Sequence, residues 1–260
     1  THDFKVTQSG RLAIKGTGGR EWQILATPDA PPSVTPNPEI GREADGRFKQ
    51  KFAAKDDYGV TKGEVTITLD LDAVDRRYGL ATAPDPVPPV VLDLPMPVKG
   101  ARTEIDATLI DDLSEHVFAN LPVTLTYQVT DAAGQTGTAE PIHAVLPGKR
   151  FFDPLAAALV EMRRDILWSR ANAPRAVQIL KAVTNQPEGF ITNEKAYLRL
   201  RVAIKRLDTE AANLTDTTRD EIAAELWQIA LILEDGDLQS AKARLDHAQD
   251  RLDEAIRRGA

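Results

Sequence analysis

The sequence contains no cysteine among its 260 residues. The chain therefore cannot form disulfides, and it cannot build the zinc sites that rely on thiolate ligands. The absence leaves the cellular compartment open, because a cysteine-free protein can function on either side of a membrane. Stability has to come from packed cores, and a hydrophobic content of 42% is sufficient for two domains of ordinary size.

Long hydrophobic runs are absent as well. No stretch approaches the roughly 20 apolar residues that cross a bilayer, and no basic and then apolar leader opens the chain. The sequence begins at Thr1 rather than at a methionine, so we expect a fragment of a longer protein whose anchor or targeting signal lies elsewhere.

Basic residues are not in excess. The formal net charge is −7, and the acidic excess falls in residues 1–148, while residues 149–260 are balanced. A protein that binds a phosphate backbone needs clustered lysine and arginine. We therefore expect no nucleic-acid partner.

Sequence signatures of catalysis are missing. No serine lies in a G-x-S-x-G or S-x-x-K motif, and the glycines of residues 16–19 are not followed by Lys-Ser or Lys-Thr, so this stretch predicts a hairpin loop rather than a phosphate loop. We predict no catalytic residue, no cofactor and no histidine-based metal site. The four histidines are scattered along the chain at His2, His116, His143 and His247.

The first part of the chain alternates apolar and polar residues with period two. Residues 3–16 alternate around Ser9 and Gly10, which predicts a β-hairpin, and a proline-rich connector follows it. Short alternating runs separated by turn residues then predict an antiparallel β-sandwich of immunoglobulin or fibronectin type over residues 31–148. The pattern leaves open whether residues 1–30 complete this sandwich or end a preceding β-domain.

Two loops of this predicted sandwich contain aspartate followed by glycine. Asp56 and Asp57 precede Gly59, and Asp131 precedes Gly134. Aspartate side chains accept hydrogen bonds from nearby backbone amides in turns, and glycine adopts the φ values that other residues avoid. We favour this turn role. The alternative is a calcium site built from Asp56, Asp57 and Asp131, although each loop offers few of the oxygen ligands that calcium takes.

Helical periodicity begins near residue 149. Asp153 and Pro154 have the form of an N-cap and first helical residue. Further helices are predicted from Pro174 to about Thr184, from Asn193 to about Leu207, and from a capping box formed by Thr218 and Glu221.

The last predicted helix has the most regular pattern. Gly236 is expected to end the fourth helix and Asp237 to cap a fifth, so that the two form an antiparallel hairpin. We therefore predict an α+β protein whose domain 149–260 is a bundle of about five helices. Leucines 238, 245 and 252 are candidate partner contacts, and packing against the fourth helix is the alternative. The apolar seam of the fifth helix has 3-4-3-4-3 spacing and consists of Leu238, Ala241, Leu245, Ala248, Leu252 and Ala255.

Three stretches resemble one protein family. They begin at Asp111, Leu146 and Glu225 and read "DDLSEHVFANLPVTLTYQVTDAAGQTG", "LPGKRFFDPLAAALVEMRRDILW" and "ELWQIALILEDGDLQSAKARLDHAQDRLDEAIRRGA". They are similar to a proteobacterial group of membrane-anchored envelope proteins classed as a domain of unknown function. The resemblance implies a β-rich and helical periplasmic region, tethered to the inner membrane by segments outside this chain. It implies no catalytic residues.

Three functions are compatible with these features. The first is a non-catalytic periplasmic scaffold with a protein partner in the cell envelope or a second copy of the chain. The second is a module that binds an envelope polymer or small ligand where sandwich and helices meet, because Phe151, Phe152, Arg163 and Arg164 bring aromatic and basic groups to that boundary. The third is a carboxylate-based hydrolase, whose facing carboxylates would come from separated loops.

Overall fold

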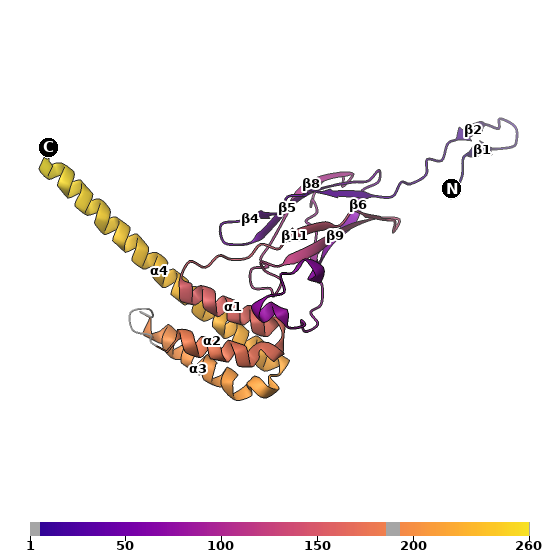
Figure 1. Cartoon of the computed structure of the whole chain (residues 1–260). Helices are drawn as coiled ribbons and strands as arrows, with labels where there is room; N and C mark the ends of the chain where they lie inside the picture. Colours follow the sequence, from indigo (N-terminus) through magenta and orange to yellow (C-terminus); the bar gives the residue numbers. More distant parts are fainter. Residues whose placement is uncertain (1–5, 186–192, 260) are drawn as a thin grey trace.

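The computed structural model describes residues 6–185 and 193–259, and beyond Gly236 the described side chains are those of Lys242, Leu245 and Gln249. Strands occupy the chain up to Val145, and α-helices follow from Pro154 onward (Figure 1). The chain is thus a mixed α+β protein with antiparallel sheets in its N-terminal part and four α-helices in the described C-terminal part.

Two antiparallel sheets share one hydrophobic core. In the first sheet the central strand β5 pairs with β3 and β4 along one side and with β8 along the other. In the second sheet β9 lies between β6 and the short strands β10 and β11, and β7 pairs with the far side of β6. The bounds are β3 (Ser33–Pro36), β4 (Gly41–Arg42), β5 (Phe48–Lys55), β8 (Glu104–Asp111), β6 (Val60–Leu69), β7 (Val90–Asp93), β9 (Pro122–Asp131), β10 (Thr136–Thr138) and β11 (Ile142–Val145).

The core between these sheets follows the predicted alternation. Every second residue of β5 and of β9 is buried, so Phe48 and Phe52 from one sheet meet Leu125 and Tyr127 from the other. The Tyr127 hydroxyl donates a hydrogen bond to buried Gln50, and burial raises the pKa of this tyrosine. The central strands are therefore fixed by apolar packing and by one satisfied polar pair.

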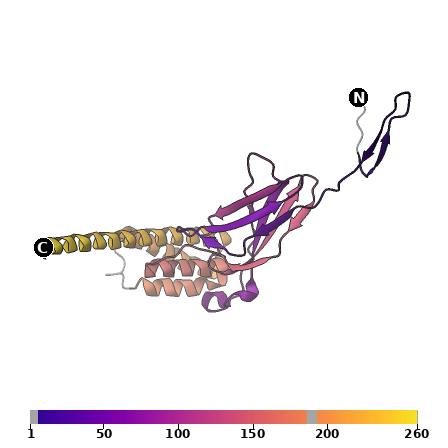
Figure 2. The ribbon, with the colours of Figure 1, turned by 90° about the horizontal axis from the view of Figure 1, so that it is seen from above.

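A separate hairpin precedes the two sheets. Strands β1 (Gly10–Ala13) and β2 (Glu21–Ile24) pair with each other and, in the described part of the chain, with no other strand (Figures 1 and 2). The expected turn at Ser9 and Gly10 is wrong, because Gly10 already pairs with Ile24, and much of the strand predicted before it lies outside the described residues. The turn falls instead at residues 14–20, which confirms a hairpin loop at the glycines.

The four α-helices enclose a second core. They are α1 (Pro154–Trp168), α2 (Ala173–Val183), α3 (Glu194–Glu210) and α4 (Asp216–Gly259). The cap at Asp153 is confirmed, since its carboxylate accepts from the Ala156 amide at 2.6 Å. The capping box at Thr218 is wrong by one turn, because the hydroxyl of Thr215 accepts from the Thr218 amide at 3.2 Å and α4 begins at Asp216. Short 3-10 turns lie at Leu71–Ala73, Tyr78–Ala81, Arg170–Asn172 and Ala211–Asn213.

Helix α4 is continuous through Gly236, so the predicted break and the hairpin of a fourth and fifth helix are wrong. A glycine inside a helix costs only about 1 kcal/mol relative to alanine, and beyond the flanking aspartates the chain continues with good helix formers, Leu233 and Glu234 on one side and Leu238 and Gln239 on the other. The helix runs past the other three and leaves the bundle, as the yellow ribbon shows (Figures 1 and 2). Over the described residues, no helix combines the length and hydropathy needed to cross a bilayer.

Because α4 is continuous at Gly236, we predict that Gly236→Ala stabilises the helix. A side chain at this position would meet no atom within 4 Å, so alanine should stabilise the helix by up to about 1 kcal/mol. Native-state hydrogen exchange of the amides just after residue 236 should slow by up to about fivefold.

Gly134→Ala is the matched control, because that glycine is equally unobstructed but has a φ of +84°. This control should destabilise the protein through backbone strain. Faster exchange in Gly236→Ala would contradict a continuous α4.

Candidate functional site

The loop that connects β8 to β9 lies between the sheets and the helices. Its Leu113, Val117 and Phe118 are buried in the core between the sheets, while Leu121 packs with Trp168 at the end of α1. The backbone of Glu115 in the same loop accepts a hydrogen bond from Arg163 of α1. This junction loop, residues 112–121, therefore joins the two parts of the molecule.

Arg163 is the central polar residue of the junction. Its side chain is only 8% exposed, its Nε donates to the Ala223 carbonyl at 3.1 Å, and its Nη2 donates to the Glu115 carbonyl at 2.7 Å. The guanidinium lies over the ring of Trp227 at 5.0 Å. Burial lowers the pKa of Arg163 and nearby Glu115 opposes that shift, but a guanidinium stays charged at any physiological pH.

A pocket of about 230 Å³ opens beside this arginine, which we call the junction pocket. Phe151 and Trp227 form an aromatic wall, with ring centroids 5.2 Å apart in an edge-to-face arrangement. The Nε of Arg164 is buried and has no hydrogen-bond partner among the described residues. The polar and charged lining consists of Ser114, His116, Asn120, Lys149, Glu161, Arg163 and Arg164.

His116 contributes a neutral imidazole to this pocket. Burial, and secondly the positive charge of Arg163, lower the pKa of His116. Its Nδ1 accepts from the Phe118 amide at 3.2 Å, which assigns the proton of the neutral ring to Nε2. The ring is therefore a hydrogen-bond donor at neutral pH, and it adds no charge.

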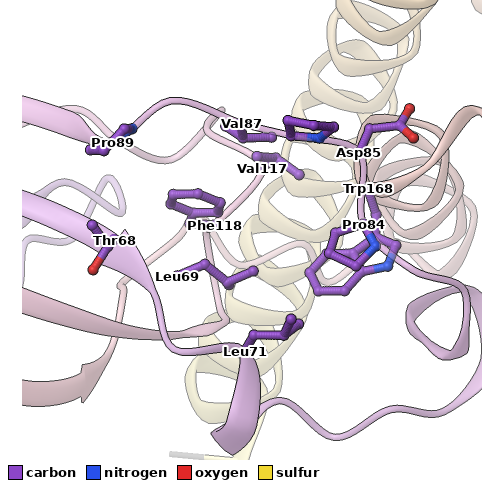
Figure 3. Close-up of a pocket in the computed structure, with 11 residues that line it drawn as sticks. Thr68, Leu69, Leu71, Pro84, Asp85, Val87, Pro89, Val117, Phe118 and Trp168 are labelled. Atoms are coloured by element: carbon purple, nitrogen blue, oxygen red, sulfur yellow. The ribbon is translucent and has the colours of Figure 1, made fainter.

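A second, apolar pocket of about 330 Å³ also borders the junction loop, through Val117 and Phe118 (Figure 3). Leu69, Leu71, Phe118 and Trp168 form its walls together with the proline-rich segment 84–89. The indole Nε1 of Trp168 already donates to the Thr82 carbonyl at 2.8 Å. This pocket therefore offers little to orient a polar ligand.

The carboxylate of the apolar pocket is also occupied. Asp85 accepts hydrogen bonds from the amide and the Nε of Arg170, each at 3.0 Å. Burial alone would raise the pKa of Asp85, but the hydrogen bonds and charge of Arg170 outweigh it and hold the pKa below its ordinary value. Asp85 thus anchors the proline-rich segment to the end of α1, and the junction pocket is the better candidate site.

The structure brings together three of the four residues predicted at the boundary. Phe151, Arg163 and Arg164 all line the junction pocket. Phe152 does not, because its side chain is 75% exposed while its amide donates to Glu234 of α4 at 2.8 Å. Sequence reasoning did not place Lys149, Asn120, His116 or Trp227 at this site. Lys149 lies two residues before Phe151, whereas the other three come from separate segments.

The aspartates considered for calcium serve their own turns. Asp56 accepts from the amides of Tyr58 at 3.1 Å and Gly59 at 2.5 Å, and Asp131 accepts from the Gln135 amide at 2.8 Å. Asp57 is exposed, accepts from the Ala30 amide at 3.4 Å and lies near Asp29, whose pKa is raised by burial and also by Asp57. Within the described residues, no group of three or more histidine, aspartate or glutamate side chains is placed to hold a metal ion.

The predicted seam of the last helix lies on the projecting part of α4. Leu245 is 57% exposed there. The side chains of Leu238 and Leu252 lie outside the described residues. Because α4 is one helix, its first half cannot fold back to cover the seam.

Comparison with known proteins assigns this architecture to a family. The described residues form antiparallel sheets followed by a helical bundle, and a buried arginine joins the two parts. The chain matches the model of the domain of unknown function DUF4175 over residues 1–260, and it belongs to that family.

Other comparisons are distant. No curated protein matches the chain. Among solved structures, a β-1,2-glucanase from Parabacteroides distasonis aligns with 9% sequence identity and a TM-score of 0.26, covering 80% of this chain and 35% of the glucanase chain. The chain thus spans about a third of the length of that enzyme, and a likeness this weak carries no argument.

The turn role of Asp56 predicts how its variants behave. Asp56→Ala removes the acceptor of two amides and should lower the free energy of unfolding by about 1–3 kcal/mol. Asp56→Asn keeps an acceptor oxygen and should retain most of that stability. Urea denaturation measures both.

Asp57→Ala is the control and should change stability by less than about 0.5 kcal/mol. A rise in the melting temperature on addition of millimolar calcium, lost in Asp56→Asn, would contradict the turn role and support a calcium site.

Proposed function

We propose that this DUF4175 chain is a non-catalytic periplasmic scaffold that assembles through the part of α4 beyond Gly236, which we call the α4 extension. The observation that carries the proposal is a continuous helix that leaves its bundle with Leu245 exposed. The resemblance to membrane-anchored envelope proteins supports the periplasmic location and a tether to the inner membrane through segments outside this chain.

The bundle ends near Glu234. This buried side chain accepts from the amides of Phe152 and Asp153, at 2.8 and 3.0 Å, where α1 begins. The α4 extension, residues 237–259, is about 35 Å long at 1.5 Å per residue. In proteins most helical stability comes from the packing of an apolar face, so a partner that covered the seam would stabilise the extension.

The sequence of the extension fits a second copy of itself. Leucine and alanine alternate at coiled-coil spacing, so that large and small side chains can interlock between two helices. Acidic and basic residues balance over residues 237–259, so two extensions carry no net charge that would drive them apart. We therefore take a second copy of the chain as the partner, and another envelope protein as the alternative.

Strand pairing supports the finer fold assignment, an immunoglobulin- or fibronectin-like sandwich. In this interpretation β3, β5 and β8 correspond to strands A, B and E of one sheet, and β6, β9 and β10 with β11 to strands C, F and G of the other. Such domains commonly act as spacers and contact modules rather than as enzymes, which is an analogy of fold alone.

A second candidate function is ligand binding at the junction pocket. It is favoured by the aromatic wall of Phe151 and Trp227 beside an unpaired donor of Arg164. The third function considered, a carboxylate-based hydrolase, finds less support here, because Glu161 is the single carboxylate in the junction pocket lining and glycoside hydrolysis by this route uses two.

Assembly through the α4 extension predicts a dimer that depends on concentration. Light scattering over a range of protein concentrations should show a mass that rises toward twice the 28.4 kDa of the chain. Replacing Leu245 and Leu252 by Asp should shift the chain to monomer without loss of fold, because a buried charge in the seam has no partner.

His247→Asp is the matched control. It introduces the same side chain on the opposite face of the helical repeat, and it should leave the dimer intact. A monomer at every concentration would overturn self-assembly. Loss of folding in the Leu245 and Leu252 variant, seen by circular dichroism, would show that the seam is internal core.

A further inference from the structure

We propose that the junction pocket binds the anionic group, a carboxylate or a phosphate, of a small ligand. The inference rests on the second candidate function and names its ligand class. It is independent of assembly through the α4 extension.

The residues that line the junction pocket are mostly basic among those that carry a charge. Lys149, Arg163 and Arg164 line the pocket, and Glu161 is the carboxylate among the lining residues. In the described part of the chain, none of these three basic residues forms an ion pair with a carboxylate. The lining thus has an excess of positive charge, three cations against Glu161, although the carboxylate of Glu115 also acts on Arg163, in a chain whose net charge is −7.

The second step is the orphan donor of Arg164. Its buried Nε lacks an acceptor, which is costly, and its guanidinium makes no hydrogen bond among the described residues, so a ligand oxygen in the pocket would not have to displace a protein partner. Arginine presents its donors in a planar fork that suits carboxylate and phosphate oxygens. Arg163 cannot make this contact as readily, because two of its nitrogens already hold backbone carbonyls. We therefore assign direct contact to Arg164 and Lys149, and a supporting field to Arg163.

The volume of the pocket and its remaining lining residues limit the kind of ligand that can bind. A volume of about 230 Å³ admits a small group rather than a chain segment. The aromatic wall of Phe151 and Trp227 can cover an apolar part of the ligand, while the Nε2 proton of His116 and the amide of Asn120 add neutral donors. An anion attached to a compact apolar or sugar-like group fits this combination.

The apolar pocket provides an internal contrast. Its one carboxylate, Asp85, would repel an anion, and Arg170 is already bound to it. Anionic ligands should therefore discriminate between two pockets that border the same loop.

Isothermal titration calorimetry on the full chain in low-salt, phosphate-free buffer tests the inference. The two probes are inorganic phosphate and N-acetyl-D-alanyl-D-alanine, whose free carboxylate distinguishes the two possible sources of charge. The same dipeptide with an amidated C-terminus is the neutral control. We expect at least one anionic probe to bind and the neutral control to bind at least about tenfold more weakly.

Variants localise the binding. Arg164→Gln and Lys149→Gln should each weaken the anionic probe by about tenfold, because each removes a charge-assisted contact. Arg42→Gln is the matched control, since Arg42 is an exposed arginine at the edge strand β4, and it should change nothing. Circular dichroism checks that each variant is folded, and chemical shift changes at the Trp227 indole report binding at this pocket.

Two results would overturn the inference in different ways. If the neutral dipeptide binds as tightly as the charged one, the anion assignment fails while a ligand-binding module stands. If neither anion binds at 10 mM, or if binding is unchanged in both Arg164→Gln and Lys149→Gln, the pocket is not an anion site and the second candidate function loses its support as well.

Discussion

The buried guanidinium of Arg163 is the interaction on which the arrangement of sheets and helices depends. A charge this deep is tolerated only when its donors are bonded, and here they are bonded to carbonyls of the junction loop and of α4. Each hydrogen bond to a charged group contributes about 1.5–3 kcal/mol. The bonds can form only if α1, α4 and the junction loop meet in one geometry, so the charge selects a single relative placement of the sheets and the bundle.

The same charge gives the junction its chemical character. Its positive field is directed partly into the ring of Trp227 and partly toward a pocket that already contains Lys149 and Arg164. It also helps to keep His116 neutral. Placing several cations close together raises the electrostatic free energy of the pocket, and a bound anion would lower it. The charge of Arg163, which positions the sheets and the helices, therefore also favours the anionic ligand proposed for Lys149 and Arg164.

The sequence correctly predicted features that depend only on residues close together in the chain, such as a helix cap and the alternation of a strand. Asp153 with Pro154 began α1 as expected, and burial in β5 and β9 alternates with the predicted period of two, because capping and pleating are set within a few residues. Gly236 misled the prediction, since a glycine that ends a helix and one inside a helix have the same sequence signature until tertiary packing decides. Phe151 and Arg164 could be placed at the junction because they flank one boundary, whereas Trp227 and Lys149 are nearly 80 residues apart and meet only through the fold.

Helix α4 connects the two candidate functions physically. Trp227 forms a wall of the junction pocket, Glu234 accepts from the amides at the start of α1 where the bundle ends, and Leu245 lies on the extension about 27 Å beyond Trp227. These residues belong to one continuous helix, so a ligand at the pocket and a partner on the extension would act on the same rigid element. Such coupling requires that α4 has two positions that both events favour differently. Gly236 lies between the junction pocket and the seam of the extension. A bend of the helix at this glycine would uncouple movements at the pocket from movements at the seam.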